Sequence, residues 1–360
     1  MNSLNTLTLE CNRQIKINFA GGDLSSDAGL LLIKEFAAKL GFTKLIKNKF
    51  KTNDKAVRLH MDDENLMQMI YQIIIASYFE DDCADELTND PVFNAILDKD
   101  GLTGDLLKAE LRDGTLHWSN DADKFMEPIL QEYLNREIKT YLRGDSGFST
   151  PKLYEMCECN GCSYAIRLKQ NKSLIALASD KDDALYEASK ENQIDYTVTY
   201  GEFMYQAGSW DYPRRVVFKI EKPYGQLTHM YTFIVTNMDM EAYQVIQFYC
   251  GRGKMENFIK EGKSGFDFAA VSSHSKTVNA NRMRIHMLAY NLFNWFRRMV
   301  LPANMRNKQV DTIRLKLMKI ATRAVKSARY ITFKLCSSCP YKKEFYETLG
   351  NIQHLIIQLE

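Results

Sequence analysis

The segment around residues 138–151 constrains the fold more than any other part of the sequence. An apolar strand pattern, Ile138–Leu142, runs directly into the glycine-bearing stretch Leu142-Arg-Gly-Asp-Ser-Gly-Phe148. Ser149 or Thr150 then caps a helix that has Pro151 in its first turn. A strand that turns through glycines into a helix is typical of α/β proteins, which place their chemistry at the carboxyl edge of the sheet.

Asp145 lies in this junction, between the strand and the helix. Enzymes with α/β folds hold functional carboxylates at this place in the sheet. Aspartate also closes loops by an Asx turn, in which the side chain accepts a hydrogen bond from the following main chain. Both roles, functional carboxylate and loop-closing turn, are open for Asp145 on this evidence.

Strand and helix patterns continue on both sides of this junction. The expected strands are Gln14–Phe19, Leu106–Leu111 and Ser163–Leu168. Residues 172–231 are expected to be β-rich, with strand patterns at Tyr196–Tyr200, Arg215–Ile220 and Met230–Val235. The expected helices are Leu30–Leu40, Glu64–Phe79, Ala122–Leu134, 241–262, 279–300 and 308–327. The order predicts an α/β chain whose N- and C-terminal regions are helical.

Charge is distributed unevenly along the chain. The net charge is only +2, but residues 251–347 contain 20 Lys and Arg against 6 Asp and Glu. Aromatic residues are interleaved with these cations, and they are Tyr290, Phe293, Trp295 and Phe296. A basic region of this kind suits a nucleic-acid partner, although solvated helix faces would give the same composition.

The sequence gives no sign of a membrane partner. The most apolar stretch, Met67–Phe79, is interrupted by Gln68 and Gln72 and is too short to span a bilayer. We expect no secretory signal, because the first six residues lack a basic-then-apolar pattern. A cytoplasmic location is therefore expected, with the eight cysteines mostly as free thiols.

A second carboxylate, Glu256, lies in a helical pattern that is rich in cations. At 100° per residue, five residues fall within about 80° of one another on one face: Tyr249, Arg252, Glu256, Lys260 and Lys263. A separate apolar stripe should dock the same helix on a sheet, and its members are Phe248, Met255, Ile259 and Phe266. A lone acid among cations is usually an i,i+4 pairing face. Here the sharper interpretation is a metal-binding glutamate flanked by cations that contact phosphate.

These residues resemble a known family. The spacing Y-x2-R-x3-E-x6-K from Tyr249 to Lys263 is similar to the signature of insertion-sequence DDE transposases, and Leu142–Phe148 looks like the motif around their second aspartate. Three further stretches resemble the subgroup called transposase DDE domain group 1, and they are Leu24–Leu30, Asp90–Phe93 and Tyr290–Asn294.

The resemblance implies a ribonuclease H-like core in which three carboxylates hold two Mg²⁺ or Mn²⁺ ions. It makes Asp145 and Glu256 the catalytic, metal-binding residues. It assigns DNA-backbone contacts to Tyr249, Arg252, Lys260 and Lys263. The implied partners are double-stranded DNA, both the terminal inverted repeats of the element and its target, and a second copy of the chain in a homodimer.

The chain departs from the family at the first catalytic aspartate. Relatives carry it on the first core strand, in a long segment for which this chain has no counterpart, because Phe93 leads almost directly to Gly101. Asp98 and Asp100 are the nearest acids, and they lie in a polar loop at the deletion junction. Two carboxylates alone bind a pair of Mg²⁺ poorly, and losing the first strands leaves their neighbours unpaired.

We therefore expect an α/β chain with a ribonuclease H-like core that lacks its first strands. The expected regions are 1–100, mainly helical; 101–171, the first part of the core; 172–231, a β-rich insertion; 232–300, the second part of the core; and 301–360, basic and helical. The expected function is DNA strand cleavage and transfer by a two-metal DDE mechanism, impaired in this copy. The alternative is a non-catalytic DNA-binding or dimerising transposase fragment.

Overall fold

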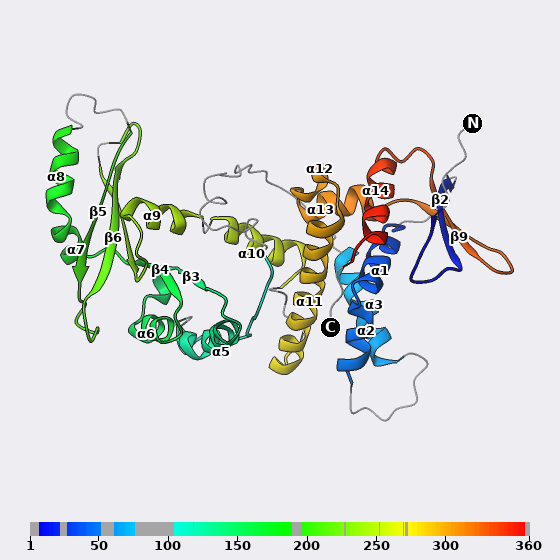
Figure 1. Cartoon of the computed structure of the whole chain (residues 1–360), viewed down its shortest axis with the longest axis horizontal. Helices are drawn as coiled ribbons and strands as arrows, with labels where there is room; N and C mark the ends of the chain where they lie inside the picture. The colour runs from blue at the N-terminus through cyan, green and yellow to red at the C-terminus, as the bar shows by residue number, and fades with distance from the viewer. Residues whose placement is uncertain are drawn as a thin grey trace. The chain divides into compact units, whose positions relative to one another are not determined.

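The computed structural model describes residues 7–21, 27–51, 61–75, 104–117, 119–188, 196–226, 228–251, 253–268, 270 and 273–356. The chain has a mixed α/β architecture with two mixed sheets (Figure 1). It forms two compact units, one made of Met1–Leu111 and Glu256–Glu360, the other of Arg112–Met255. Among the described residues, no helix is long and apolar enough to cross a membrane.

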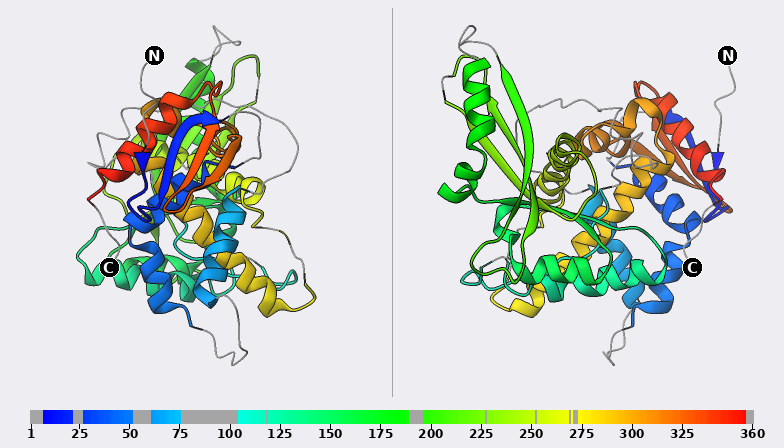
Figure 2. Two further views of the ribbon diagram at one scale, coloured as in Figure 1. Left: turned by 90° about the vertical axis from the view of Figure 1, so that its right-hand side faces the viewer. Right: turned by 60° about the vertical axis from the view of Figure 1, so that its left-hand side comes forward.

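The first unit contains a four-stranded sheet in the order β1-β2-β9-β8. Its strands are β1 (Leu7–Thr8), β2 (Ile15–Gly21), β8 (Thr322–Lys326) and β9 (Ile331–Cys336). β2 and β9 run parallel, with Ile15 opposite Ile331, and the two outer pairs are antiparallel. Strands from the two ends of the chain thus share one sheet (Figure 2). The predicted opening strand is confirmed as β2.

Helices cover one face of this sheet and build the core of the first unit. They are α1 (Leu30–Lys39), α2 (Phe42–Lys49), α3 (Asp62–Ile75), α10 (Gly253–Gly265), α11 (Lys276–Val300), α12 (Ala303–Arg306), α13 (Val310–Ile313) and α14 (Lys342–Gln353). Phe19 of β2 packs edge-on against Phe345 of α14, with 5.3 Å between ring centroids. The predicted helices are confirmed for α1, α11 and the described part of α3.

The predicted helix over 308–327 is wrong. After the short α13 and a π-helical turn, η2 (Arg314–Met318), the chain enters β8 at Thr322. β8 pairs with β9 as an antiparallel hairpin, and this pairing stabilises the extended conformation over the helical alternative. The C-terminal region is therefore not purely helical.

The second unit contains a five-stranded sheet in the order β3-β4-β7-β6-β5. Its strands are β3 (Tyr141–Gly144), β4 (Ser163–Leu168), β5 (Thr197–Tyr205), β6 (Arg214–Lys222) and β7 (Met230–Thr236). Its helices are α5 (Ala122–Asn135), α6 (Pro151–Cys159), α7 (Lys172–Leu177), α8 (Ser179–Ala188) and α9 (Ala242–Cys250). β3 and β4 are parallel, and the other pairs are antiparallel. The predicted strand over 163–168 is confirmed, and so are the three strands predicted between residues 196 and 235. The start of the stretch 172–231 is not β-rich, because α7 and α8 occupy it.

The predicted strand over Leu106–Leu111 is wrong, because residues 104–113 have no regular secondary structure. None of the described strands pairs with this segment. Its main chain is held instead by the α11 side chains, since Asn291 Nδ2 donates to the carbonyl of Leu106 at 2.8 Å. A strand needs a partner for its polar groups, and here a helix side chain takes that place.

Candidate active site at the end of strand β3

Asp145 directly follows β3, as the sequence predicted, and begins the single 3₁₀ turn η1 (Ser146–Phe148). Its Oδ1 accepts a hydrogen bond from the amide of Ser146 at 2.7 Å. Helix α6 then starts at Pro151 with Thr150 at its N-cap, so the predicted strand–turn–helix junction is confirmed. The Asp145 carboxylate therefore helps to close the turn. It also lies at the carboxyl end of a strand, where α/β folds place functional residues.

Gly144 explains the close packing at the end of β3. A Cβ built on Gly144 would lie 3.1 Å from Cγ1 of Ile166 on β4, so a larger residue would require the Ile166 side chain to shift. β3 is also the first strand in the sheet order, and it pairs with β4 on one side only. Asp145 therefore follows the strand that forms the edge of this sheet within the described part of the chain.

Arg143 links β3 to the end of α9, a contact that sequence reasoning missed. Its Nη1 donates to the carbonyl of Phe248 at 2.9 Å, and its guanidinium lies 4.6 Å from the centroid of the Phe248 ring. Burial lowers the pKa of Arg143 below its ordinary value. A Cβ on Gly251 would lie 2.6 Å from Arg143 Nη1, so this glycine gives the guanidinium its space. The only sequence signal was a cation inside an apolar strand.

Glu256 lies on α10, but the single helix predicted over 241–262 is wrong. The chain forms α9 up to Cys250 and then a new helix, α10, from Gly253. Glu256, Lys260 and Lys263 share one exposed face of α10. The opposite face packs through Phe258, which lies over Gly104, and through Glu261, which pairs with Arg297.

The predicted apolar stripe does not dock α10 on a sheet. Met255 is 37% exposed and Ile259 is 51% exposed. Besides Phe258, helix α10 makes contacts through small and polar residues, since a Cβ on Gly265 would meet Val310 and Glu261 Oε1 accepts from the Val310 amide at 3.1 Å. The other two members of the stripe, Phe248 and Phe266, are buried, but Phe248 lies on α9 and Phe266 follows the end of α10, so the four residues do not form one face of a single helix.

The structure places only some of the other predicted site residues on the exposed face of α10 that carries Glu256. Tyr249 is buried on α9, with 7% of its surface exposed, and so does not belong to the exposed face of Glu256. Lys260 and Lys263 do belong to that face. Arg252, Asp98 and Asp100 lie outside the described residues.

The acidic residues fall short of the three-carboxylate set that the resemblance implies. Asp145 is in the second unit and Glu256 is in the first, so their separation is not fixed by either unit alone. Within the described ranges, no group of three His, Cys, Asp or Glu side chains is placed to hold a metal ion. The carboxylates that the structure describes do not complete a two-metal site.

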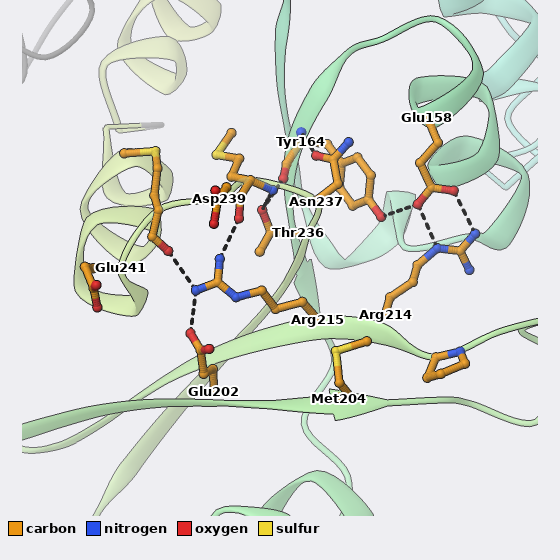
Figure 3. Close-up of a pocket in the computed structure, with 13 residues that line it drawn as sticks. Glu158, Tyr164, Glu202, Met204, Arg214, Arg215, Thr236, Asn237, Asp239 and Glu241 are labelled. Atoms are coloured by element: carbon orange, nitrogen blue, oxygen red, sulfur yellow. Dashed lines mark hydrogen bonds and ion pairs between the residues drawn. The ribbon is translucent and has the colours of Figure 1, made fainter.

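A separate polar pocket of about 610 Å³ lies in the second unit between α6 and strands β5–β7 (Figure 3). Its charged groups are largely paired with one another. Arg214 forms a bidentate pair with Glu158 at 3.0 and 3.1 Å, and Arg215 donates to Glu202 and to the carbonyls of Met238 and Met240. These pairs hold the sheet to its helix and loop, which accounts for the polar lining without a ligand.

A comparison with protein families gives a match over nearly the whole chain. The family model described as Transposase DDE domain group 1 matches residues 7–101 and residues 96–357. The two matched segments meet at residues 96–101. No curated protein sequence matches the chain.

Proposed function

The chain belongs to the family Transposase DDE domain group 1, and from this premise we propose that it is an insertion-sequence transposase whose ribonuclease H-like core has lost its first strands. The proposed substrate is double-stranded DNA at the terminal inverted repeats of the element and at its target, met in the cytoplasm. The reaction is strand cleavage and strand transfer by in-line displacement at phosphorus. Catalysis is impaired in this copy.

One contact carries the proposal: Arg143 of β3 binds the end of α9, directly before the helix that holds Glu256. Arg143 is two residues before Asp145, and its partner Phe248 is three residues before Gly251. Within the second unit, this contact therefore ties the Asp145 motif to the end of α9, from which the chain leads into α10.

Three features support the loss of the first core strands. Among the described strands β3 has a partner on one side only, residues 104–113 have no such strand beside them, and Met255 and Ile259 on α10 are exposed. Each is the expected consequence when the neighbouring strands of a sheet are removed. The two segments that match the family meet at residues 96–101, at the junction that the sequence suggested.

We infer that catalysis is impaired because one of the metal-binding carboxylates is missing. The family resemblance implies a pair of Mg²⁺ or Mn²⁺ ions bridged by carboxylates, with the missing aspartate as one of the bridging ligands. Asp145 and Glu256 alone do not fit that pair, so no catalytic step is assigned to metal ions here. Lys260 and Lys263, exposed beside Glu256, retain the capacity to contact DNA phosphates as point charges.

The test is Mg²⁺-dependent cleavage of a duplex that carries the element's own terminal repeats, measured with the wild-type chain and Glu256→Gln. We expect both proteins to bind the duplex and neither to cleave it. Cleavage by the wild type alone would contradict the impairment. Absence of binding by either protein would contradict DNA as the substrate of this copy.

A second arm tests the roles of the carboxylates. Insertion of the corresponding segment of a full-length relative at residues 96–101 should restore cleavage. Glu256→Gln and Asp145→Asn should each abolish the restored cleavage, and Glu127→Gln on the exposed face of α5 should leave it unchanged. Restored cleavage that survives Glu256→Gln would rule out this glutamate as a catalytic residue.

A further inference from the structure

The sheet of the first unit has two chemically different faces. The inner face joins the core through apolar side chains, and they are Leu7, Ile15, Ile17, Phe19, Phe333 and Leu335. Thr322, opposite Leu335, is a buried polar residue of the same face. The alternate positions point outward, because successive side chains of a strand lie on opposite faces. Register places seven residues on that outer face: Thr8, Lys16, Asn18, Arg323, Val325, Thr332 and Lys334.

The charge of this outer face has one sign. It carries three cations, Lys16, Arg323 and Lys334, and none of its seven residues is acidic. Arg323 lies directly opposite Lys334 in the β8–β9 pair. Like charges in directly opposed positions destabilise a sheet. Neither residue forms an ion pair with any of the described residues, so nothing within that part of the chain offsets this repulsion.

The cationic face continues into the loops at one end of the sheet. Arg13, just before β2, and Arg329 and Tyr330, just before β9, are all exposed. The ammonium of Lys16 lies 3.7 Å from the centroid of the Tyr330 ring. Figure 2 (left) shows this sheet facing the viewer, with no described helix of the first unit in front of it. We call the outer face together with these loop residues the basic sheet face.

We propose that the basic sheet face binds the phosphate backbone of duplex DNA, as a contact surface separate from the Asp145 and Glu256 motifs. The three cations lie on three consecutive strands, which span about 10 Å at the usual strand spacing. Duplex DNA carries one charge per about 1.7 Å of its axis, so the face can meet several phosphates at once. Threonine and asparagine between the cations add hydrogen-bond donors for phosphate and make the face unsuitable for an apolar partner.

This inference rests on the proposed function for the identity of the partner, and the experiment separates the two. The test variant is Lys16→Gln/Arg323→Gln/Lys334→Gln in the full chain. The control is Lys169→Gln/Lys172→Gln/Lys181→Gln, which removes the same charge from exposed positions of the second unit. Affinity for a duplex of arbitrary sequence is measured by fluorescence anisotropy between 50 and 200 mM salt.

Loss of three phosphate contacts should reduce the slope of log K against log salt by about 2.7 in magnitude. The affinity advantage of the wild type over the test variant should therefore shrink about 40-fold between 50 and 200 mM salt. The control variant should keep the wild-type slope. Equal slopes for wild type and test variant, or an equal loss in the control, would overturn the inference and leave the proposed function standing. A wild-type chain that does not bind DNA would overturn both.

A single variant keeps the test valid if the triple variant does not fold. Arg323→Gln removes one of the two opposed cations, so it should leave the thermal unfolding temperature unchanged or raise it. It should also reduce the salt slope by about 0.9. A lower unfolding temperature together with an unchanged slope would assign Arg323 a structural role and contradict the proposal.

Discussion

The side-chain amide of Asn291 makes two hydrogen bonds to the main chain of Leu106, as a neighbouring strand would. Its Oδ1 accepts from the Leu106 amide at 2.8 Å and its Nδ2 donates to the Leu106 carbonyl at 2.8 Å. Asn294 and Arg298 bind the adjacent Asp105 carboxylate, each at 2.7 Å. One face of α11 thus replaces sheet neighbours for a segment that has a strand-like sequence.

Asn291→Ala should therefore destabilise the first unit. The substitution leaves the amide and the carbonyl of Leu106 without these partners, and a half-buried unsatisfied polar group costs about 1–3 kcal/mol. Urea unfolding of the full chain measures the change in free energy. Asn135→Ala, at an exposed position on α5, should change it by less than about 0.5 kcal/mol. Equal effects of the two substitutions would mean that the Asn291 bonds contribute nothing.

Gly29→Ala should be more damaging than its small size suggests. A Cβ on Gly29 would lie 2.0 Å from the Leu317 carbonyl oxygen and 2.3 Å from the Met318 Cα, and neither main-chain atom can swing away as a side chain does. The Gly29 amide also donates to the Met318 carbonyl at 3.0 Å, so separation of the segments breaks a hydrogen bond.

Overpacking of this kind costs about 1–3 kcal/mol or more, and we expect the Gly29→Ala effect at or above the upper value. Thermal unfolding checks it against Gly208→Ala, where a Cβ would meet no atom within 4 Å. A Gly29 variant as stable as the Gly208 variant would show that the contact with η2 relaxes freely. The contact gives a physical reason for the glycine in one of the stretches that resembled the family.

Sequence patterns predicted the elements that depend on local signals. β4 was predicted with its observed bounds, and α6 was predicted with its first turn at Pro151, because turn residues and caps mark both elements. β8 was missed because its extended conformation depends on pairing with β9. Residues 106–111 show the reverse error. Their sequence has a strand pattern, but none of the described strands pairs with them, so they do not form a strand.

The candidate site was predictable only in part. Asp145 and the shared face of Glu256, Lys260 and Lys263 followed from motif spacing and helical periodicity. Periodicity could not show that the helix is interrupted after Cys250, which leaves Tyr249 buried on a different helix. Arg143 was missed because its role comes from Phe248, 105 residues away in the chain.

Acid should weaken the second unit through Glu158. Burial raises the pKa of this carboxyl, but hydrogen bonds from Arg214, Tyr212 and Tyr164 outweigh it, so the pKa lies below its ordinary value of 4.5. A carboxyl with a lowered folded-state pKa contributes stability above the unfolded-state pKa and loses it as pH falls through the folded-state pKa. Stability from this group should thus be complete near pH 6 and decline below about pH 4.5.

Glu158→Gln is the test, because it keeps the shape and removes the titrating group. Hydrogen exchange of β6 peptides should show protection that falls between pH 6 and pH 3.5 more steeply in the wild type than in the variant, after correction for the intrinsic exchange rate. Glu132→Gln, in an exposed pair with Arg136 on α5, should follow the wild type. If protection falls equally with pH in the wild type and in Glu158→Gln, other carboxylates determine the loss of stability in acid.

The buried pair of Glu261 and Arg297 should be costly to break and inexpensive to replace. Arg297 Nη1 and Nη2 donate to Glu261 Oε1 and Oε2 at 2.8 and 2.9 Å, and the two side chains are only 13% and 9% exposed. Glu261→Leu leaves the guanidinium buried without its carboxylate, and removal of one partner from a buried pair costs about 3–5 kcal/mol. The double variant Glu261→Leu/Arg297→Met removes both charges and should recover part of that loss, because the desolvation cost of both ions disappears while the Val310 amide still lacks its acceptor. Urea unfolding of the two single variants and the double variant gives the coupling energy. Additive losses would mean that the pair is solvated in solution, and α10, which carries Glu256, would then be held to α11 by packing alone.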